Sequence, residues 1–204
     1  MRLLIDESVE NMKRVETIIE LHARVDKADI GTEDERSELL RAAVVFLHSS
    51  IEEVVRNLFV EFLPKGDTKT LNELSYSGNG LTDRSKGVLF GDLLKNHSGR
   101  FVENVIIDCI NAYVDRLNIN NSEQLVSQLK KVKIDTDTLS PFLDDLDQLM
   151  RRRHQIVHQM DRDDKLDPMS RAVTRIDATT VKKWFGSILG FNEQIILQLD
   201  RLAT

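Results

Sequence analysis

Apolar side chains recur at three- and four-residue steps along almost every long segment of this 204-residue chain. That spacing places them on one face of an α-helix, and no segment shows the sustained two-residue alternation of a half-buried strand. Only three prolines and nine glycines are present, so few positions oblige a helix to end. The sequence therefore predicts an all-α fold, a bundle of helices with essentially no sheet.

Two long helices are predicted in the amino-terminal part. The first covers about residues 7–27, and its apolar stripe includes His22, which we interpret as a core or interface histidine. Thr32 and Glu35 then have the spacing of a capping box, which predicts the start of a second helix. The apolar stripe of this second helix continues to about residue 63.

Two more long helices are predicted in the carboxy-terminal part. Ser140 and Pro141 combine a capping hydroxyl with a proline at the first helical position, which predicts a helix that continues to about residue 160. The charged segment 161–177 follows and is predicted to be a solvated loop. The last helix carries one apolar face over residues 181–199.

The long helices are predicted to form a single domain over residues 1–204, with the core helices in about 5–63 and 138–200. Residues 64–135 are interpreted as a helical insertion between them. It is predicted to contain a glycine-rich loop near residue 78, a helix over about 101–117, and a short helix over about 123–131 that Ser122 caps.

Composition excludes several classes of protein. The single cysteine, Cys109, cannot form an intramolecular disulfide, which fits a reducing compartment. No stretch approaches the roughly 20 apolar residues of a membrane helix. A net charge of −6 argues against a surface that coats long nucleic acid, although it leaves room for a small, locally basic site. We expect a soluble cytoplasmic protein that does not enter the membrane.

One charged residue departs from the helical pattern between residues 140 and 160. The apolar stripe of that predicted helix consists of Leu146, Leu149, Met150, Val157 and Met160. At ~100° per residue, Arg153 falls within roughly 20° of the centre of the stripe, whereas Arg151 and Arg152 fall outside it and are interpreted as a solvated face. A guanidinium on a burying face is unfavourable unless it is paired or lines a polar cleft. Arg153 is therefore a candidate functional residue.

His154 and His158 are four residues apart, so they are neighbours on the flank of the same helix. Arginine binds phosphate and stabilises charge that builds on it, and histidine moves protons near neutral pH. Together with Arg153, the two histidines form the minimum set of groups for metal-free cleavage of RNA through its 2′-hydroxyl. Two alternatives stay open: Arg153 pairs with a carboxylate such as Glu52 or Glu61, or the two histidines bind zinc.

A further candidate pair, of one histidine and one glutamate, lies earlier in the chain. His48 and Glu52, four apart, share one flank of the second predicted helix. They are either a solvated pair or residues that line a cleft.

The segment from Arg153 to His158 fits the Arg-x(4–6)-His signature of HEPN domains, including the polar residue that these domains favour after the arginine. Residues 40–52 resemble the preceding core helix of the same superfamily, and the chain is most similar to its RiboL-PSP branch. The resemblance covers about residues 5–63 and 138–200. It implies an up-and-down core of four helices and a homodimer in which both copies bring their arginine and histidine to one cleft.

The resemblance also implies a function. Many HEPN proteins are metal-independent endoribonucleases of toxin–antitoxin, antiviral-defence or RNA-processing systems, and others are binding modules without catalysis. In the first case RNA is the substrate, an antitoxin protein is a further partner, and neither a metal nor a cofactor is expected. His158 would move protons, Arg153 would stabilise the phosphate, and His154 would orient the site or contact RNA. His48 and Glu52 are candidates for supporting positions behind them.

Overall fold

The computed structural model describes residues 2–65, 68–72, 74, 90–162 and 173–202. These residues form the helices α1 (Arg2–Lys27), α2 (Glu33–Phe62), α3 (Thr68–Asn72), α4 (Phe90–His97), α5 (Val102–Val114), α6 (Ser122–Lys131), α7 (Ser140–Gln159) and α8 (Ala178–Leu202). The only extended pairing among them is an isolated bridge between Arg162 and Val173. The predicted all-α fold is confirmed. None of the described helices is both long and apolar enough to cross a membrane.

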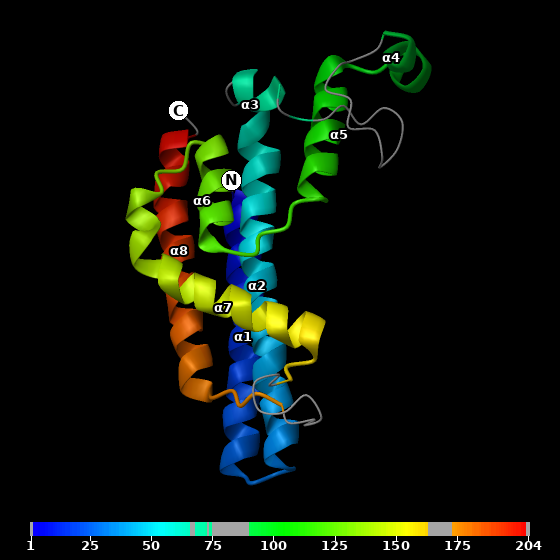
Figure 1. The fold of residues 1–204 in the computed structure, drawn as a ribbon. Helices are drawn as coiled ribbons and strands as arrows, with labels where there is room; N and C mark the ends of the chain where they lie inside the picture. Colours follow the sequence, from blue (N-terminus) through cyan, green and yellow to red (C-terminus); the bar gives the residue numbers. More distant parts are fainter. Residues whose placement is uncertain (1, 66–67, 73, 75–89, 163–172, 203–204) are drawn as a thin grey trace.

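Three long helices lie side by side, and a fourth crosses them. The helices α1 and α2 form an antiparallel pair with α8 against them, and α7 lies across this group at a steep angle (Figure 1). The helices α3 and α4 lie at one end of the molecule, near the carboxy-terminal end of α2, and α5 runs beside the carboxy-terminal part of α2 (Figure 1). The crossing of α7 over α2 brings the predicted Arg153 helix against the flank of α2.

One continuous hydrophobic cluster holds the bundle together. Its fully buried members include Val44 and Leu47 on α2, Leu149 on α7 and Phe191 on α8. The cluster also takes in part of the predicted insertion, through the buried residues Ile110, Val114, Ile119, Leu125 and Leu129. Residues 110–129 therefore belong to the same core as the long helices, whereas the predicted glycine-rich loop near residue 78 lies outside the described residues.

The capping residues predicted from the sequence are only partly confirmed. The capping box at Thr32 is present, with its hydroxyl accepting from the Glu35 amide at 3.2 Å and the Glu35 carboxylate accepting from the Thr32 amide at 2.7 Å. The helix α7 begins at Ser140 as predicted, but that hydroxyl donates to the Asp137 carbonyl rather than capping the helix. The cap of α6 is Asn121 and not Ser122, because the Asn121 side chain accepts from the Gln124 amide.

The two halves of α7 have different surroundings. Its amino-terminal half buries Leu146 and Leu149, and it packs on α2 and α8. Its carboxy-terminal half extends past α2 (Figure 1), so Val157 is 42% exposed and Met160 is 72% exposed. The apolar stripe predicted from spacing is therefore only half covered. The half that is left open carries the candidate residues.

Candidate functional site

The exposed end of α7 brings three of the predicted site residues together. His154 and His158 are both exposed, with ring centroids 4.7 Å apart and ring planes inclined by 46°. Arg153 leaves the helix roughly 100° from His154 and is half-buried toward α2. The structure thus places one guanidinium and two imidazoles on adjoining sides of the same helical turns. This part of the site follows directly from helix geometry.

Arg153 is incompletely partnered. Its Nε is buried and has no hydrogen-bond partner among the residues that the structure describes. Of the two carboxylates considered as partners, Glu61 receives a hydrogen bond from Lys65 at 3.2 Å. Glu52 is close enough for the charge of Arg153 to lower the pKa of its carboxyl group. The electrostatic neighbour of Arg153 is therefore Glu52, on α2.

Glu52 and His48 form a connected pair beneath this arginine. His48 is 1% exposed, its Nε2 lies 2.9 Å from the Ile119 carbonyl oxygen, and its Nδ1 lies 3.5 Å from a Glu52 oxygen. Burial acts to raise the pKa of Glu52, but His48, Arg153 and the Ile119 amide together hold it below the ordinary value. The interpretation as a solvated pair is wrong for His48, which is buried against the Ile119 carbonyl, whereas the side chain of Glu52 is 28% exposed.

A buried ion network lies next to this pair, and it corrects two sequence interpretations. One oxygen of Asp161 accepts from Arg41 Nε at 2.6 Å and from an Arg152 terminal nitrogen at 2.7 Å. The side chains of Arg41, Asp161 and Arg152 are only 8%, 2% and 11% exposed. Arg152 was expected on a solvated face and Asp161 in a solvated loop, and both expectations are wrong. Burial lowers the pKa of Arg152, against the opposing effect of Asp161.

The network extends into the chain that follows α7. The Thr174 carbonyl accepts from both arginines, at 3.0 Å from Arg41 and 2.8 Å from Arg152. The Thr174 amide donates to the Asp161 carbonyl at 2.7 Å, and its hydroxyl accepts from Gln155 at 2.8 Å. These contacts hold the end of α7 through Arg152 and Gln155.

Helix spacing gives no signal for this buried network. Arg41 lies inside a run of apolar residues on α2, but at ~100° per residue it falls roughly 90° from the centre of the apolar stripe of that helix, so the argument that singled out Arg153 does not single out Arg41. Asp161 lies in a predicted loop, where helix spacing says nothing about burial. It is buried only because Arg41, 120 positions away in the sequence, meets it in the fold.

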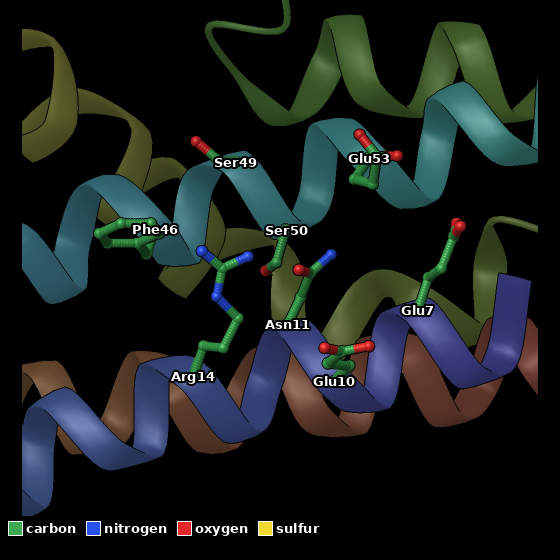
Figure 2. A pocket seen from close by; sticks show the side chains of 8 residues that line it. All are labelled: Glu7, Glu10, Asn11, Arg14, Phe46, Ser49, Ser50 and Glu53. Atoms are coloured by element: carbon green, nitrogen blue, oxygen red, sulfur yellow. The ribbon is translucent and has the colours of Figure 1, made fainter.

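A groove of about 460 Å³ lies on the other flank of α2, between α1 and α2. Figure 2 shows Arg14 and Asn11 reaching from α1 toward Phe46 and Ser50 of α2. At ~100° per residue, its lining on α2 is roughly 130° around the helix from His48 and Glu52. It is therefore separate from the cluster on α7.

A second hollow, of about 800 Å³, lies between α3, α4 and α5. Its walls are mainly apolar, and Cys109 lines it together with Leu71, Phe90, Leu94 and Ile106. Neither hollow contains Arg153 or His158. Within the described ranges, no three His, Cys, Asp or Glu side chains come together as a metal-binding group.

The comparison with known families agrees with the site pattern. The model of the RiboL-PSP-HEPN family matches residues 8–201, which is nearly the whole chain. The protein therefore belongs to the RiboL-PSP-HEPN family, and the resemblance to the HEPN superfamily and to this branch is confirmed. The match runs through residues 64–135 as well. No curated protein and no solved structure matches the chain.

Proposed function

We propose that this protein is a metal-independent endoribonuclease of the HEPN type. The observation that carries the proposal is the state of Arg153, a guanidinium on a burying face whose Nε lacks a hydrogen-bond partner in the described chain. It adjoins two exposed imidazoles on the same turns. A charge held in that position without full compensation is unfavourable for folding, so a functional reason for it is favoured.

The proposed reaction uses the 2′-hydroxyl of RNA as the nucleophile. Its oxygen attacks the adjacent phosphorus, the bond from phosphorus to the 5′-oxygen breaks, and the products are a 2′,3′-cyclic phosphate and a 5′-hydroxyl. His158 takes the proton from the 2′-hydroxyl or delivers one to the 5′-oxygen. Arg153 stabilises the negative charge of the pentacoordinate phosphorus. His154 orients the site or contacts RNA, while Glu52 and His48 support Arg153 from α2.

A homodimer is part of the proposal, because one copy offers a single arginine and two adjacent histidines. A two-fold interface is self-complementary, so a second copy packed on the open end of α7 would bring two sets together and cover Val157 and Met160. Family membership further suggests a role in toxin–antitoxin or antiviral-defence systems, with RNA as substrate and an antitoxin protein as partner.

The test is incubation of the purified protein with mixed RNAs in the presence of EDTA. We expect cleavage that leaves 2′,3′-cyclic phosphate ends, detected by their resistance to direct ligation. The variants Arg153→Ala and His158→Ala should lack it, while Arg151→Ala, which alters an exposed neighbour, should retain it. Cleavage that survives both substitutions but disappears with chelator would contradict the proposal.

A second function is favoured by one observation. Glu52 lies close enough to Arg153 for their charges to interact, and a compensated arginine fits a HEPN domain that binds a nucleotide or a partner protein without catalysis. In that case purified protein would bind RNA or nucleotide, with binding lost in Arg153→Ala, but no new RNA ends would form.

A further inference from the structure

We propose that Asp161 is a positioning residue for the site on α7, acting through Arg41 and Arg152. This inference rests on the proposed function, because it assigns the device that holds Arg153 and His158 in place. The residue lies just after the helix and touches neither of them in the contacts described above. Its effect is mechanical: it fixes the last turns of α7 relative to α2.

The geometry of the network is that of a clamp between two helices. Arg41 belongs to α2 and Arg152 to α7, and both donate to the same oxygen of Asp161, at 2.6 Å and 2.7 Å. All three side chains are almost completely shielded from water. Charge-assisted hydrogen bonds that are shielded from solvent are stronger and more directional than exposed ones. Asp161 therefore sets the distance between α2 and the end of α7.

The backbone at this point depends on the same residue. Met160 and Asp161 both have left-handed backbone conformations, with φ of 53° and 55°, which are unfavourable for side chains other than glycine. The Asp161 amide donates to the Gln155 carbonyl at 3.1 Å and its carbonyl accepts from the Thr174 amide at 2.7 Å. A strained turn persists only where the surroundings fix it, and the buried carboxylate is the centre of those surroundings.

The network holds the side of α7 that carries Arg152, and the opposite side of the helix is exposed. Arg152 and Gln155 bind the following segment through Thr174. His154 leaves the helix roughly 160° from Arg152, and His158 leaves it roughly 120° from Arg152. Both histidines are exposed. Because this half of α7 extends past α2 (Figure 1), no packing on α2 holds its exposed side. The position of the site residues must therefore come from the clamped side.

The two neighbouring arginines of α7 have different roles in this arrangement. Arg152 donates hydrogen bonds to the Asp161 carboxylate and to the Thr174 carbonyl. Arg153 leaves the helix roughly 100° further round, near Glu52. Because a helix is stiff over one turn, fixing Arg152 also fixes the direction in which Arg153 points. The negative charge of Asp161 at the carboxy-terminal end of a helix is itself unfavourable. Arg41 and Arg152 offset it.

Asp161→Asn and Asp161→Glu are the variants that test this inference. The first keeps the shape of the side chain and removes its charge, and the second keeps the charge. The matched control is Asp145→Asn, because Asp145 also anchors α7 through two donors, Lys183 at 2.7 Å and Ser187 at 2.6 Å. Its contacts tie the other half of α7 to α8. Both Asn variants lose an anchoring charge, but only one lies beside the site.

The first measurement is steady-state cleavage of a defined RNA. Because a displacement of about 1 Å can slow a reaction by ~10²-fold, we expect Asp161→Asn to lower kcat by about tenfold to a hundredfold and to leave KM within about twofold. Asp161→Glu should recover most of kcat. Asp145→Asn should lower the melting temperature and leave kcat unchanged. An equal loss of kcat in the two Asn variants, or no loss in Asp161→Asn, would overturn the inference.

The second measurement does not depend on cleavage. Amide hydrogen exchange should become faster over residues 153–160 in Asp161→Asn, while residues 142–150 stay protected, and Asp145→Asn should show the reverse. If the wild-type protein cleaves no RNA, the proposed function fails, and the exchange pattern alone then decides whether the clamp exists. Unchanged exchange at 153–160 would contradict it. Should Asp161→Asn not fold, Arg152→Lys, which keeps the charge but loses the planar fork, takes its place with the same expectations.

Discussion

The two halves of α7 carry the same apolar spacing and have opposite surroundings. Leu146 and Leu149 are buried in the amino-terminal half, which packs on α2 and α8. Val157 continues the same stripe in the carboxy-terminal half and is 42% exposed, and Met160, the residue that follows the helix, is 72% exposed. The difference lies in what is opposite them, because α7 crosses α2 and extends beyond it (Figure 1). One half of the helix builds the core, and the other half presents a surface with a guanidinium and two imidazoles.

This contrast separates stability from function along a single helix. Removal of side chains from the buried half should weaken the fold, since a cavity and a loss of apolar burial result. Removal of side chains from the exposed half should leave the fold intact and change what the surface does. The predictions below test that separation.

The largest effect is expected for the chemistry of the exposed half. His158→Ala should lower cleavage of RNA by ~10²–10⁴-fold, since loss of an acid–base group has effects of that size. It should leave the melting temperature nearly unchanged, because His158 is exposed. Cleavage assays beside thermal unfolding check both parts. A His158→Ala protein that retains full activity would remove His158 from the site.

The buried half should control the free energy of unfolding. Leu149→Ala should lower it by about 2–5 kcal/mol, the usual effect of truncating a fully buried leucine. Val157→Ala should change it by no more than about 0.5 kcal/mol, as is typical of exposed positions. Urea unfolding at a protein concentration below the dimer dissociation constant measures both. Equal losses would mean that α7 is covered along its whole length.

The exposed half should in turn control assembly. Val157→Glu places like charges near each other across a two-fold interface. We expect the wild-type chain to be a dimer at micromolar concentration and Val157→Glu to be a monomer with an unchanged circular dichroism spectrum. Sedimentation velocity distinguishes the two. A wild-type monomer at that concentration would contradict the proposed composite site.

The support from α2 predicts a smaller, pH-dependent effect. The pKa of Glu52 is held below its ordinary value. The ionised carboxylate therefore stabilises the fold at pH values above the ordinary pKa of a glutamate. The stabilisation is lost as the pH falls through the lowered pKa, where the folded protein must take up the proton. Glu52→Gln should therefore be less stable than wild type near neutral pH, and the gap should narrow under acid. Melting temperatures of both proteins between pH 7 and pH 3 measure it.

The smallest effect is expected in the groove between α1 and α2. Glu10→Gln and Glu53→Gln change its lining (Figure 2), but both residues lie away from α7. We expect kcat and KM for RNA to stay within about twofold, since isolated surface changes are close to neutral. A large loss of cleavage in either variant would move the functional surface to this side of α2.

Local spacing was sufficient for much of the description. The all-α fold, the capping box at Thr32, the start of α7 at Ser140 and the adjacency of His154 and His158 all depend on residues within one or two turns of each other. Arg153 stood out for the same reason, because its place on the apolar stripe can be counted from its neighbours. The sequence by itself determined these features, since the geometry of a helix repeats every 3.6 residues.

The tertiary structure decided which of these residues are covered. Spacing could not show that the stripe of α7 continues past the edge of α2, that Ile119 covers His48, or that Arg152 binds the buried Asp161 while Arg153 lies near Glu52. Each depends on segments far apart in the chain, as in the contact of Arg41 with Asp161 across 120 positions. Burial is a property of the surroundings, and periodicity gives only the direction in which a side chain points. The crossing of α7 over α2 supplies those surroundings for the residues of α7, and the segment between α5 and α6 supplies them for His48.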